Sequence, residues 1–124
     1  GGALFTLLGL DTRLRVLDVS HNFRLEGSLS MLAALVNLVS LNIGHCRKLT
    51  GEFNDLCELS NLTYLSIGYT RIDCNQALEH LEAWSKNFTE LDLSGTNMRG
   101  PLDPLGSLTR LVTLKIQDCF HLKR

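Results

Sequence analysis

Two histidines have a spacing that could place their imidazole rings side by side. His21 and His45 lie 24 residues apart, and a leucine pattern recurs over the same interval. At matching positions of neighbouring strands, their Cα atoms would lie about 5 Å apart, close enough for both rings to bind zinc. A zinc site needs further ligands, however, and the residue that continues this column is Tyr69. We therefore predict two exposed side chains at strand ends, with no metal and no cofactor.

The motifs that carry catalysis in common enzyme families are missing from this sequence. It contains no phosphate-binding G-x-x-x-x-G-K-[ST] loop, no G-x-G-x-x-G, no G-x-S-x-G nucleophile turn and no H-E-x-x-H zinc motif. The sequence therefore predicts a protein that is not an enzyme.

Composition excludes several further classes of protein. The 124 residues are 44% hydrophobic and 20% charged, which is typical of one globular domain and not of a disordered chain. Twelve Lys and Arg residues oppose thirteen Asp and Glu residues, which gives a net charge of −1. Because no basic surplus is present to neutralise a phosphate backbone, we expect no nucleic-acid partner. No apolar run approaches the roughly 20 residues of a membrane span, so we expect no membrane insertion.

Leucine dominates the sequence and recurs at a regular interval. The chain contains 27 leucines, whereas its aromatic residues amount to only 6%. Five segments share the apolar frame L-x-x-L-x-L followed by x-x and then Asn, Cys or Thr, and their first residues are spaced 24, 24, 26 and 23 apart. These segments are Leu14–Asn22, Leu38–Cys46, Leu62–Thr70, Phe88–Thr96 and Leu111–Cys119.

This frame resembles the leucine-rich repeat, and the resemblance covers the chain from Leu4 to Leu122. Steps such as Leu49-Thr-Gly51 are similar to those of plant-type repeats and of protist, kinetoplastid-like arrays. The family implies an α/β fold: a right-handed solenoid, or horseshoe segment, with a parallel concave sheet and short helices or 3₁₀ turns on the convex side. Asn22 and the Cys or Thr residues at its position should bond to backbone carbonyls of neighbouring coils.

The apolar periodicity places the expected elements. Strands are expected near 15–20, 39–44, 63–68, 89–94 and 112–117, within one domain of about five repeats. The longest connection, Asp73 to Asn87, reads as a helix, whereas residues 101–110 should be irregular or 3₁₀ because they contain Pro101, Pro104 and Gly106. Residues 1–13 resemble the convex half of a preceding repeat. Since no polar cap is seen at either end, we expect a segment of a longer array or an oligomer that covers the ends.

The concave face is the expected binding surface, because the polar strand positions line up there in columns. One column, of Ser20, Gly44, Gly68, Ser94 and Gln117, is nearly all small and should let a partner's backbone approach. Tyrosines at the centre are typical interface anchors, and the acidic residues favour a basic protein partner. The predicted partner-binding residues are Tyr64, Tyr69, Asp18, Asn42, His21, His45, Glu90, Asp92 and Lys115.

The four cysteines indicate the compartment. Cys46 and Cys119 should lie three strands apart, about 14 Å by strand spacing, which is too far for a disulfide. Cys57 and Cys74 fall at other phases of the repeat. Four unpaired thiols favour a reducing compartment, so the cytoplasm is preferred over the extracellular space.

Two N-glycosylation motifs favour the extracellular space instead. Asn61-Leu-Thr63 and Asn87-Phe-Thr89 both match the acceptor pattern. Both stand just before the leading apolar residue of a repeat, a position that the repeat itself often fills with Asn. Whether Asn61 and Asn87 carry glycans stays open.

Two functions follow from the resemblance. The first is a protein-interaction module that binds its partner on the concave sheet, as a scaffold or recognition segment of a larger protein. The second is an extracellular receptor or surface-antigen fragment that recognises a peptide or glycan. A signal peptide with a membrane anchor or kinase domain in the full-length sequence would select the second.

Overall fold

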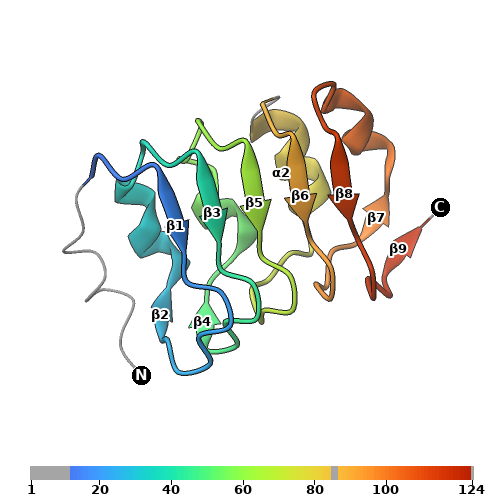
Figure 1. The fold of residues 1–124 in the computed structure, drawn as a ribbon. Helices are drawn as coiled ribbons and strands as arrows, with labels where there is room; N and C mark the ends of the chain where they lie inside the picture. Colours follow the sequence, from blue (N-terminus) through green and yellow to red (C-terminus); the bar gives the residue numbers. More distant parts are fainter. Residues whose placement is uncertain (1–11, 85–86, 124) are drawn as a thin grey trace.

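The chain coils into a solenoid with a parallel sheet along one side (Figure 1). The computed structural model describes residues 12–84 and 87–123. Five strands of three residues pair in the order β1-β3-β5-β6-β8. They are β1 (Val16–Asp18), β3 (Ser40–Asn42), β5 (Tyr64–Ser66), β6 (Glu90–Asp92) and β8 (Thr113–Lys115). The parallel solenoid predicted from the repeat is therefore confirmed.

The register of the sheet follows the leucine pattern. The middle residues of all five strands lie opposite one another: Leu17, Leu41, Leu65, Leu91 and Leu114. A slip by one residue would turn every one of these leucines to the opposite face of the sheet, so burial of the ladder fixes the register. Pairing continues past the strands, because the Ile43 amide donates to the Ser66 carbonyl at 2.9 Å.

Burial of this ladder falls off at both edges of the sheet. Leu65 at the centre is 0% exposed, whereas Leu17 on β1 is 8% exposed. The repeat frame predicts two buried ladders of apolar side chains that include Val19, Leu114 and Ile116. This prediction is wrong for these three residues, which are only partly covered. They belong to the coils of β1 and β8, the two strands that pair on one side only.

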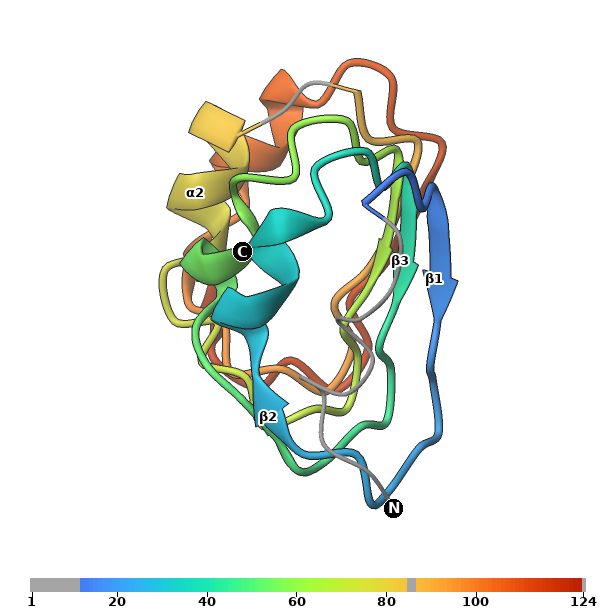
Figure 2. The same ribbon diagram turned by 90° about the vertical axis from the view of Figure 1, so that its left-hand side faces the viewer.

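Short helices cover the side opposite the sheet, as Figure 2 shows for α2 and β1. They are the 3₁₀ helices η1 (Leu29–Ala34), η2 (Phe53–Leu56) and η3 (Asp103–Ser107) and the α-helix α2 (Ala77–Trp84). Two-residue strands precede several of them: β2 (Gly27–Ser28) pairs with β4 (Leu49–Thr50), and β7 (Gly100–Pro101) pairs with β9 (Leu122–Lys123).

The connections between the strands differ in helix type, and the sequence explains the difference. The expected 3₁₀ segment within residues 101–110 is confirmed as η3, where Pro104 and Gly106 disfavour an α-helix. The expected helix from Asp73 to Asn87 is confirmed in part, because α2 begins only at Ala77. Asp73 instead bridges to the preceding coil at Glu52, and its carboxylate accepts the Asn75 amide at 3.0 Å. Residues 85–86 lie outside the described part of the chain.

An aromatic cluster, here named the buried aromatic cluster, ties α2 to the rest of the core. It consists of the buried Phe53 and Phe88 and the half-buried Trp84. The Trp84 ring meets Phe53 edge-on at 5.3 Å and Phe88 edge-on at 5.0 Å between ring centroids. Its indole Nε1 donates to the Leu59 carbonyl at 3.2 Å. Phe88 occupies the position that leucine fills in the other four copies, so the larger ring fills the space beneath the longest connection.

Two expectations about the chain's organisation lie beyond these observations. The preceding half-repeat expected over residues 1–13 falls mostly on residues 1–11, which are outside the described residues. One domain of about five repeats within a longer array stays a prediction. Among the residues that are described, no helix has the length and apolar character to traverse a bilayer.

Candidate functional site

The outer face of the five-stranded sheet presents two rows of side chains in register. Val16, Ser40, Tyr64, Glu90 and Thr113 form the first row, and Asp18, Asn42, Ser66, Asp92 and Lys115 form the second. Six of the nine predicted binding residues therefore lie on this face as expected. Because side chains alternate along a strand, both rows point away from the leucine core.

Tyr64 lies at the centre of the first row, on β5, and is half-buried. Burial raises the pKa of its hydroxyl, and the neighbouring Glu90 carboxylate raises it further, with smaller contributions from Asp92 and Asp18. The Ser66 hydroxyl offsets part of this effect through a hydrogen bond. Acidic side chains from two strands, β1 and β6, therefore act together on the hydroxyl of one central tyrosine.

The second row also shapes the backbone beyond it. The Asn42 Oδ1 accepts the Gly44 amide at 3.0 Å, and the Asp92 Oδ1 accepts the Ser94 amide at 3.1 Å. The Asp18 carboxylate accepts both the amide and the hydroxyl of Ser20, which lowers the pKa of Asp18. In three of the five coils, a carboxylate or amide oxygen of this row thus caps the turn that follows the strand.

These caps overturn the expectation that the column of small residues is open to a partner. Gly44, Gly68 and Ser94 are buried. A Cβ at Gly68 would lie 3.1 Å from the Ser94 carbonyl oxygen and 3.2 Å from the Asp92 Oδ1. The small residues therefore make room for neighbouring coils and turn caps, and a partner's backbone does not reach them.

The remaining three predicted residues lie beyond the strands, in the turns. His21, His45 and Tyr69 all adopt the left-handed backbone conformation, with φ between 55° and 61°. Counting Tyr69 with Tyr64 as a residue of the central strand, as the column pattern suggests, is therefore wrong, because β5 ends at Ser66. The left-handed turn repeats in every coil, at Gly95 and Asp118 as well. It swings each of these side chains to the edge where the strands end.

The three rings form a continuous stack, here named the ring column (His21, His45 and Tyr69). The His21 and His45 rings are 4.3 Å apart with planes 12° from parallel, and the His45 and Tyr69 rings are 4.9 Å apart at 19°. Phe23 meets the outer histidine edge-on at 6.4 Å. The side-by-side placement expected for His21 and His45 is confirmed. Stacked parallel rings present their edges to solvent, so the column offers N–H, lone-pair and hydroxyl groups along one line.

Tyr69 extends the column across the next coil. Its hydroxyl donates to the Asp118 Oδ2 at 2.7 Å, although Asp118 belongs to the second coil beyond. Gly95 lies between them, and a Cβ there would meet the Tyr69 ring at 2.3 Å. The hydrogen bond to Asp118 raises the pKa of Tyr69. A glycine in this one coil therefore lets the ring pass and fixes its orientation.

At the position filled by Asn22 in the first repeat, the cysteines bond to a neighbouring coil as expected, whereas the expectation is wrong for the threonines, which bond within their own coils. The Cys46 Sγ donates to the Val19 carbonyl at 3.0 Å, and the Thr70 and Thr96 hydroxyls donate to carbonyls within their own coils. All four cysteines carry free thiols in the structure. Burial raises the pKa of Cys74 to about 12 and that of Cys57 to about 11, so neither is a reactive nucleophile at neutral pH.

Asn61, in one of the two glycosylation motifs, has a structural use. Its amide donates to the Val36 carbonyl at 3.2 Å, and Asn37 in the preceding coil donates likewise to the Thr12 carbonyl at 2.9 Å. In these two coils, an asparagine at this position therefore links the coil to the one before it. This contact accounts for the residue without a glycan.

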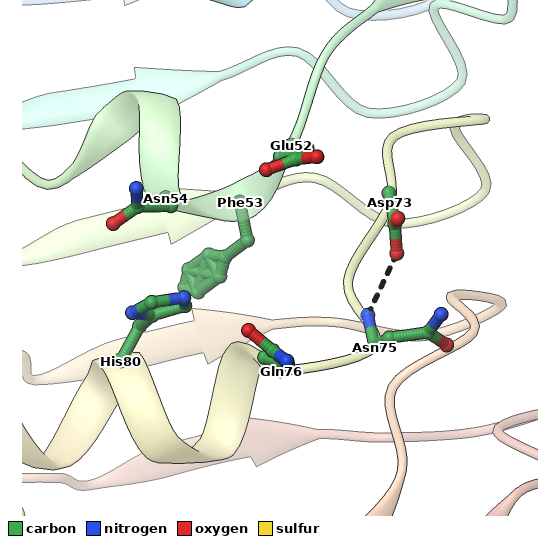
Figure 3. A pocket seen from close by; sticks show the side chains of 7 residues that line it. All are labelled: Glu52, Phe53, Asn54, Asp73, Asn75, Gln76 and His80. Atoms are coloured by element: carbon green, nitrogen blue, oxygen red, sulfur yellow. Dashed lines mark hydrogen bonds between the residues drawn. The ribbon is translucent and has the colours of Figure 1, made fainter.

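A small polar hollow of about 180 Å³ opens on the helical side between η2 and α2 (Figure 3). It is lined by Glu52, Phe53, Asn54, Asp73, Asn75, Gln76 and His80. Its backbone holds the two coils together, because the Phe53 amide donates to the Asp73 carbonyl and the Asp73 amide donates to the Gly51 carbonyl, both at 2.9 Å. The hollow is a joint between coils and holds no nucleophile paired with a base.

The arrangement of the sheet face suits binding and not covalent chemistry. Among the side chains that the structure describes, no three His, Cys, Asp or Glu residues come together as metal ligands would. The sequence did not anticipate the role of Gly95 or the contact between Tyr69 and Asp118. The signal was a single glycine in a column whose other members are His, His, Tyr and Asp.

Comparison with known proteins agrees with this architecture. A family model described as Zer-1-like leucine-rich repeats matches residues 6–107. Internalin C2 of Listeria monocytogenes is 25% identical, with a TM-score of 0.71 over 98% of this chain and 49% of its own. The leucine-rich-repeat ectodomain of the Arabidopsis thaliana receptor kinase GASSHO1/SCHENGEN3, in complex with CASPARIAN STRIP INTEGRITY FACTOR 2, is 22% identical. Its TM-score is 0.68 over 95% of this chain and 17% of its own. No curated protein sequence matches the chain.

Proposed function

The chain belongs to the Zer-1-like leucine-rich repeat family, and we propose that it binds a basic protein partner on its concave sheet face. Leucine-rich repeat domains mediate protein–protein interaction and are not enzymes. The chain spans about half the length of internalin C2 and a sixth of the receptor ectodomain, so the larger protein's role is part of this proposal. We take the chain to act as a scaffold or recognition segment of that protein.

The central position of Tyr64 is the observation that carries this proposal. It lies on the middle strand with sheet on both sides, so a partner seated there would exclude water from around the ring. Tyr69 lies just beyond the end of the same strand. Its ring stacks on His45, and its hydroxyl is hydrogen-bonded to Asp118. A side chain that is already ordered loses less conformational entropy when a partner binds.

Charge supports a basic partner. Asp18, Glu90 and Asp92 lie in the two rows of the sheet face, and Lys115 is the one cation in those rows. The acidic field at Tyr64 would attract Lys and Arg side chains and speed association. Such steering weakens as salt is added, because the Debye length shortens.

Peptides selected from a random library against the immobilised chain would test this proposal. We expect the selected peptides to be rich in Lys and Arg and to shift the backbone NMR signals of β3, β5 and β6. Tyr64→Ala should speed dissociation by about tenfold or more, as at interface anchors generally. Glu90→Gln should instead slow association at low salt and leave dissociation nearly unchanged.

Glu58→Ala is the matched control, since Glu58 is exposed and follows η2 on the helical side. This variant should leave both rates as they are. Selected peptides that shift signals of η1, η2 and α2 instead, and that dissociate from Tyr64→Ala at the original rate, would place the binding site on the convex side.

A further inference from the structure

A second surface follows the ends of the strands, where the charge changes sign. In each coil, the first residue after the Asn, Cys or Thr position is exposed: Phe23, Arg47, Arg71, Asn97 and Phe120. Arg24 and Lys48 follow directly and are exposed as well. We name Arg24, Arg47, Lys48 and Arg71 the basic edge. Along each coil it follows the residues of the ring column, which in turn follow the strands of the acidic sheet face.

The cations of the basic edge are available to a ligand. Lys48 pairs with Glu26 at 3.7 Å, but both side chains are more than half exposed, and such surface pairs contribute little. Arg24, Arg47 and Arg71 form no ion pair with any residue of the described ranges. Three guanidinium groups therefore face solvent along one edge.

Backbone hydrogen bonds hold two of these arginines in neighbouring coils. On one side of the pair, the His45 amide donates to the Gly68 carbonyl at 2.9 Å. On the other side, the Asp73 amide donates to the Gly51 carbonyl at 2.9 Å. Coils paired in this way lie about 5 Å apart, so Arg47 and Arg71 carry like charges side by side. A bound anion would relieve the repulsion between them.

The surface around Arg71 is hollowed on both sides. One open hollow, of about 420 Å³, lies toward Arg47, Lys48 and Thr50. A second, of about 560 Å³, lies toward Tyr69 and Phe120. Arg71 lines both hollows, so they meet at this side chain, and we name the two together the groove. Glu26, the ion-pair partner of Lys48, also lines the smaller hollow. Phe120, which is 84% exposed, offers an apolar surface at one end of this groove.

We propose that this groove binds an extended acidic segment of a partner protein, with an apolar side chain of that segment on Phe120. In an extended segment, alternate carboxylates are about 7 Å apart, so two of them could bind Arg47 and Arg71 at once. Guanidinium groups bind carboxylates through paired hydrogen bonds, which gives direction as well as affinity. Phe120 supplies the exposed apolar surface of this hollow, since Ile72, which also lines it, is buried.

A nucleic acid fits this edge less well than an acidic peptide. Affinity for a phosphate backbone grows with the number of phosphates that are neutralised, and the edge offers four cations. The acidic sheet face lies next to it, and Asp118 lines the larger hollow. A long polyanion that ran past the groove would be repelled, whereas a short acidic segment stays within it.

Fluorescence anisotropy with the whole chain and a labelled synthetic peptide would test the proposal. The probe is a short peptide rich in Glu and Asp with one Leu, and its Gln and Asn counterpart is the comparison. We expect the acidic peptide alone to bind, and more weakly as salt rises. Arg47→Gln and Arg71→Gln should each weaken binding about fivefold, as expected for loss of one charge-assisted contact. Arg15→Gln, which makes the same charge change on an exposed side chain before β1, should have less than about a twofold effect.

Several results would overturn this inference. Equal binding of the neutral peptide, equal weakening by Arg15→Gln, or no binding at low salt would each do so. Tighter binding of a single-stranded oligonucleotide or of phosphatidylserine vesicles would assign the edge to another class of ligand. Tyr64→Ala separates this groove from the sheet face, because it should leave affinity for the acidic peptide unchanged. Circular dichroism of the Arg15, Arg47 and Arg71 variants should match that of the unmodified chain, since these three side chains are exposed.

Discussion

The molecule contains two groups of rings that meet in opposite ways. In the buried aromatic cluster, Trp84 meets both phenylalanines edge-on, and core side chains surround the Phe53 and Phe88 rings. In the ring column, the planes lie nearly parallel, and the ring edges face solvent. The first group fills space between elements, whereas the second forms a line of polar edges along one side of the fold. Burial and not ring type therefore separates rings that stabilise the fold from rings that are free to bind.

The two groups also depend on the backbone differently. The buried cluster occurs once, where the interval between repeats lengthens to 26 residues and α2 replaces a 3₁₀ turn. The ring column arises from a left-handed turn that recurs in every coil. A recurring turn places any side chain at that position into the same line, so the residue types there are free to vary with function. The predictions below test this division, from the largest effect to the smallest.

Phe88→Ala should reduce the free energy of unfolding by about 3–5 kcal/mol, because it removes a fully buried ring and leaves a cavity. Urea unfolding followed by Trp84 fluorescence would measure the loss. Phe88→Leu is the matched control, since leucine fills this position in the other four copies. It should cost no more than about 1.5 kcal/mol. Equal losses for the two variants would mean that the ring is not packed as described.

Gly95→Ala should reduce the free energy of unfolding by about 3 kcal/mol. An alanine at this position would have to keep the left-handed backbone conformation of Gly95, and its Cβ would lie 2.3 Å from the Tyr69 ring. In a Tyr69→Ala background, the same change should cost only about 1 kcal/mol, the backbone penalty alone. Urea unfolding of the four variants in this cycle would measure the difference.

Gly100→Ala provides the control for that cycle. Gly100 also has a positive φ, of 101°, but a Cβ there would have no atom within 4 Å. Its cost should therefore be the same with or without Tyr69. A Gly95 penalty that Tyr69→Ala does not relieve would show that the ring does not cross that coil.

His45→Ala should cost only about 1 kcal/mol, although it removes the middle ring of the column. It loses two stacked contacts at the surface, and solvent fills the space that a buried cavity would leave empty. Chemical denaturation would measure it against His121→Ala, an exposed histidine outside the column that should change stability by less than about 0.5 kcal/mol. A loss as large as that of Phe88→Ala would end the distinction between the two groups.

The sequence predicted the parts of this molecule that repeat. The leucine frame gave the parallel sheet, its register and the side on which the helices lie, because a short strand with one apolar face must stack to bury it. Tyr64, Glu90 and Asp92 were placed on the sheet face by the same periodicity. Where one position recurs in five copies, a departure in a single copy does not change the prediction.

Features that depend on one residue or one contact were not predicted. The left-handed turn at Tyr69 follows from backbone torsion angles, which a pattern of apolar residues does not reveal. The burial of Gly44 depends on a cap from Asn42, and the partial exposure of Ile116 depends on its place at an edge of the sheet. The contact between Tyr69 and Asp118 joins residues 49 positions apart and needs a glycine between them. Such features emerge only when the coils are stacked in three dimensions.

The last prediction concerns the ionisation of Tyr69, where the expected effect is a shift of one titration curve. The chain has two tyrosines, so Tyr64→Phe leaves Tyr69 as the single tyrosine for an absorbance titration near alkaline pH. Its pKa should lie above the ordinary 10.0, chiefly because its hydroxyl donates to Asp118. Adding Asp118→Asn should lower that pKa, since the amide oxygen still accepts the hydrogen bond but the negative charge is gone. Glu58→Gln, which removes a carboxylate on the helical side, should not move it.

The same shift fixes how the bond contributes to stability. A folded-state pKa above that of the unfolded chain means that the contribution is fully present below pH 10 and is lost as the pH rises through the folded-state pKa. At neutral pH the Tyr69 hydroxyl stays protonated, so its ionisation should not disturb the ring column. The column should loosen only in alkali, where the hydroxyl loses its proton. The stacking of Tyr69 on His45, followed by NMR of the two rings, should weaken over the same pH range in which the absorbance changes. If the rings separate at a lower pH, a group other than the tyrosine holds the column together.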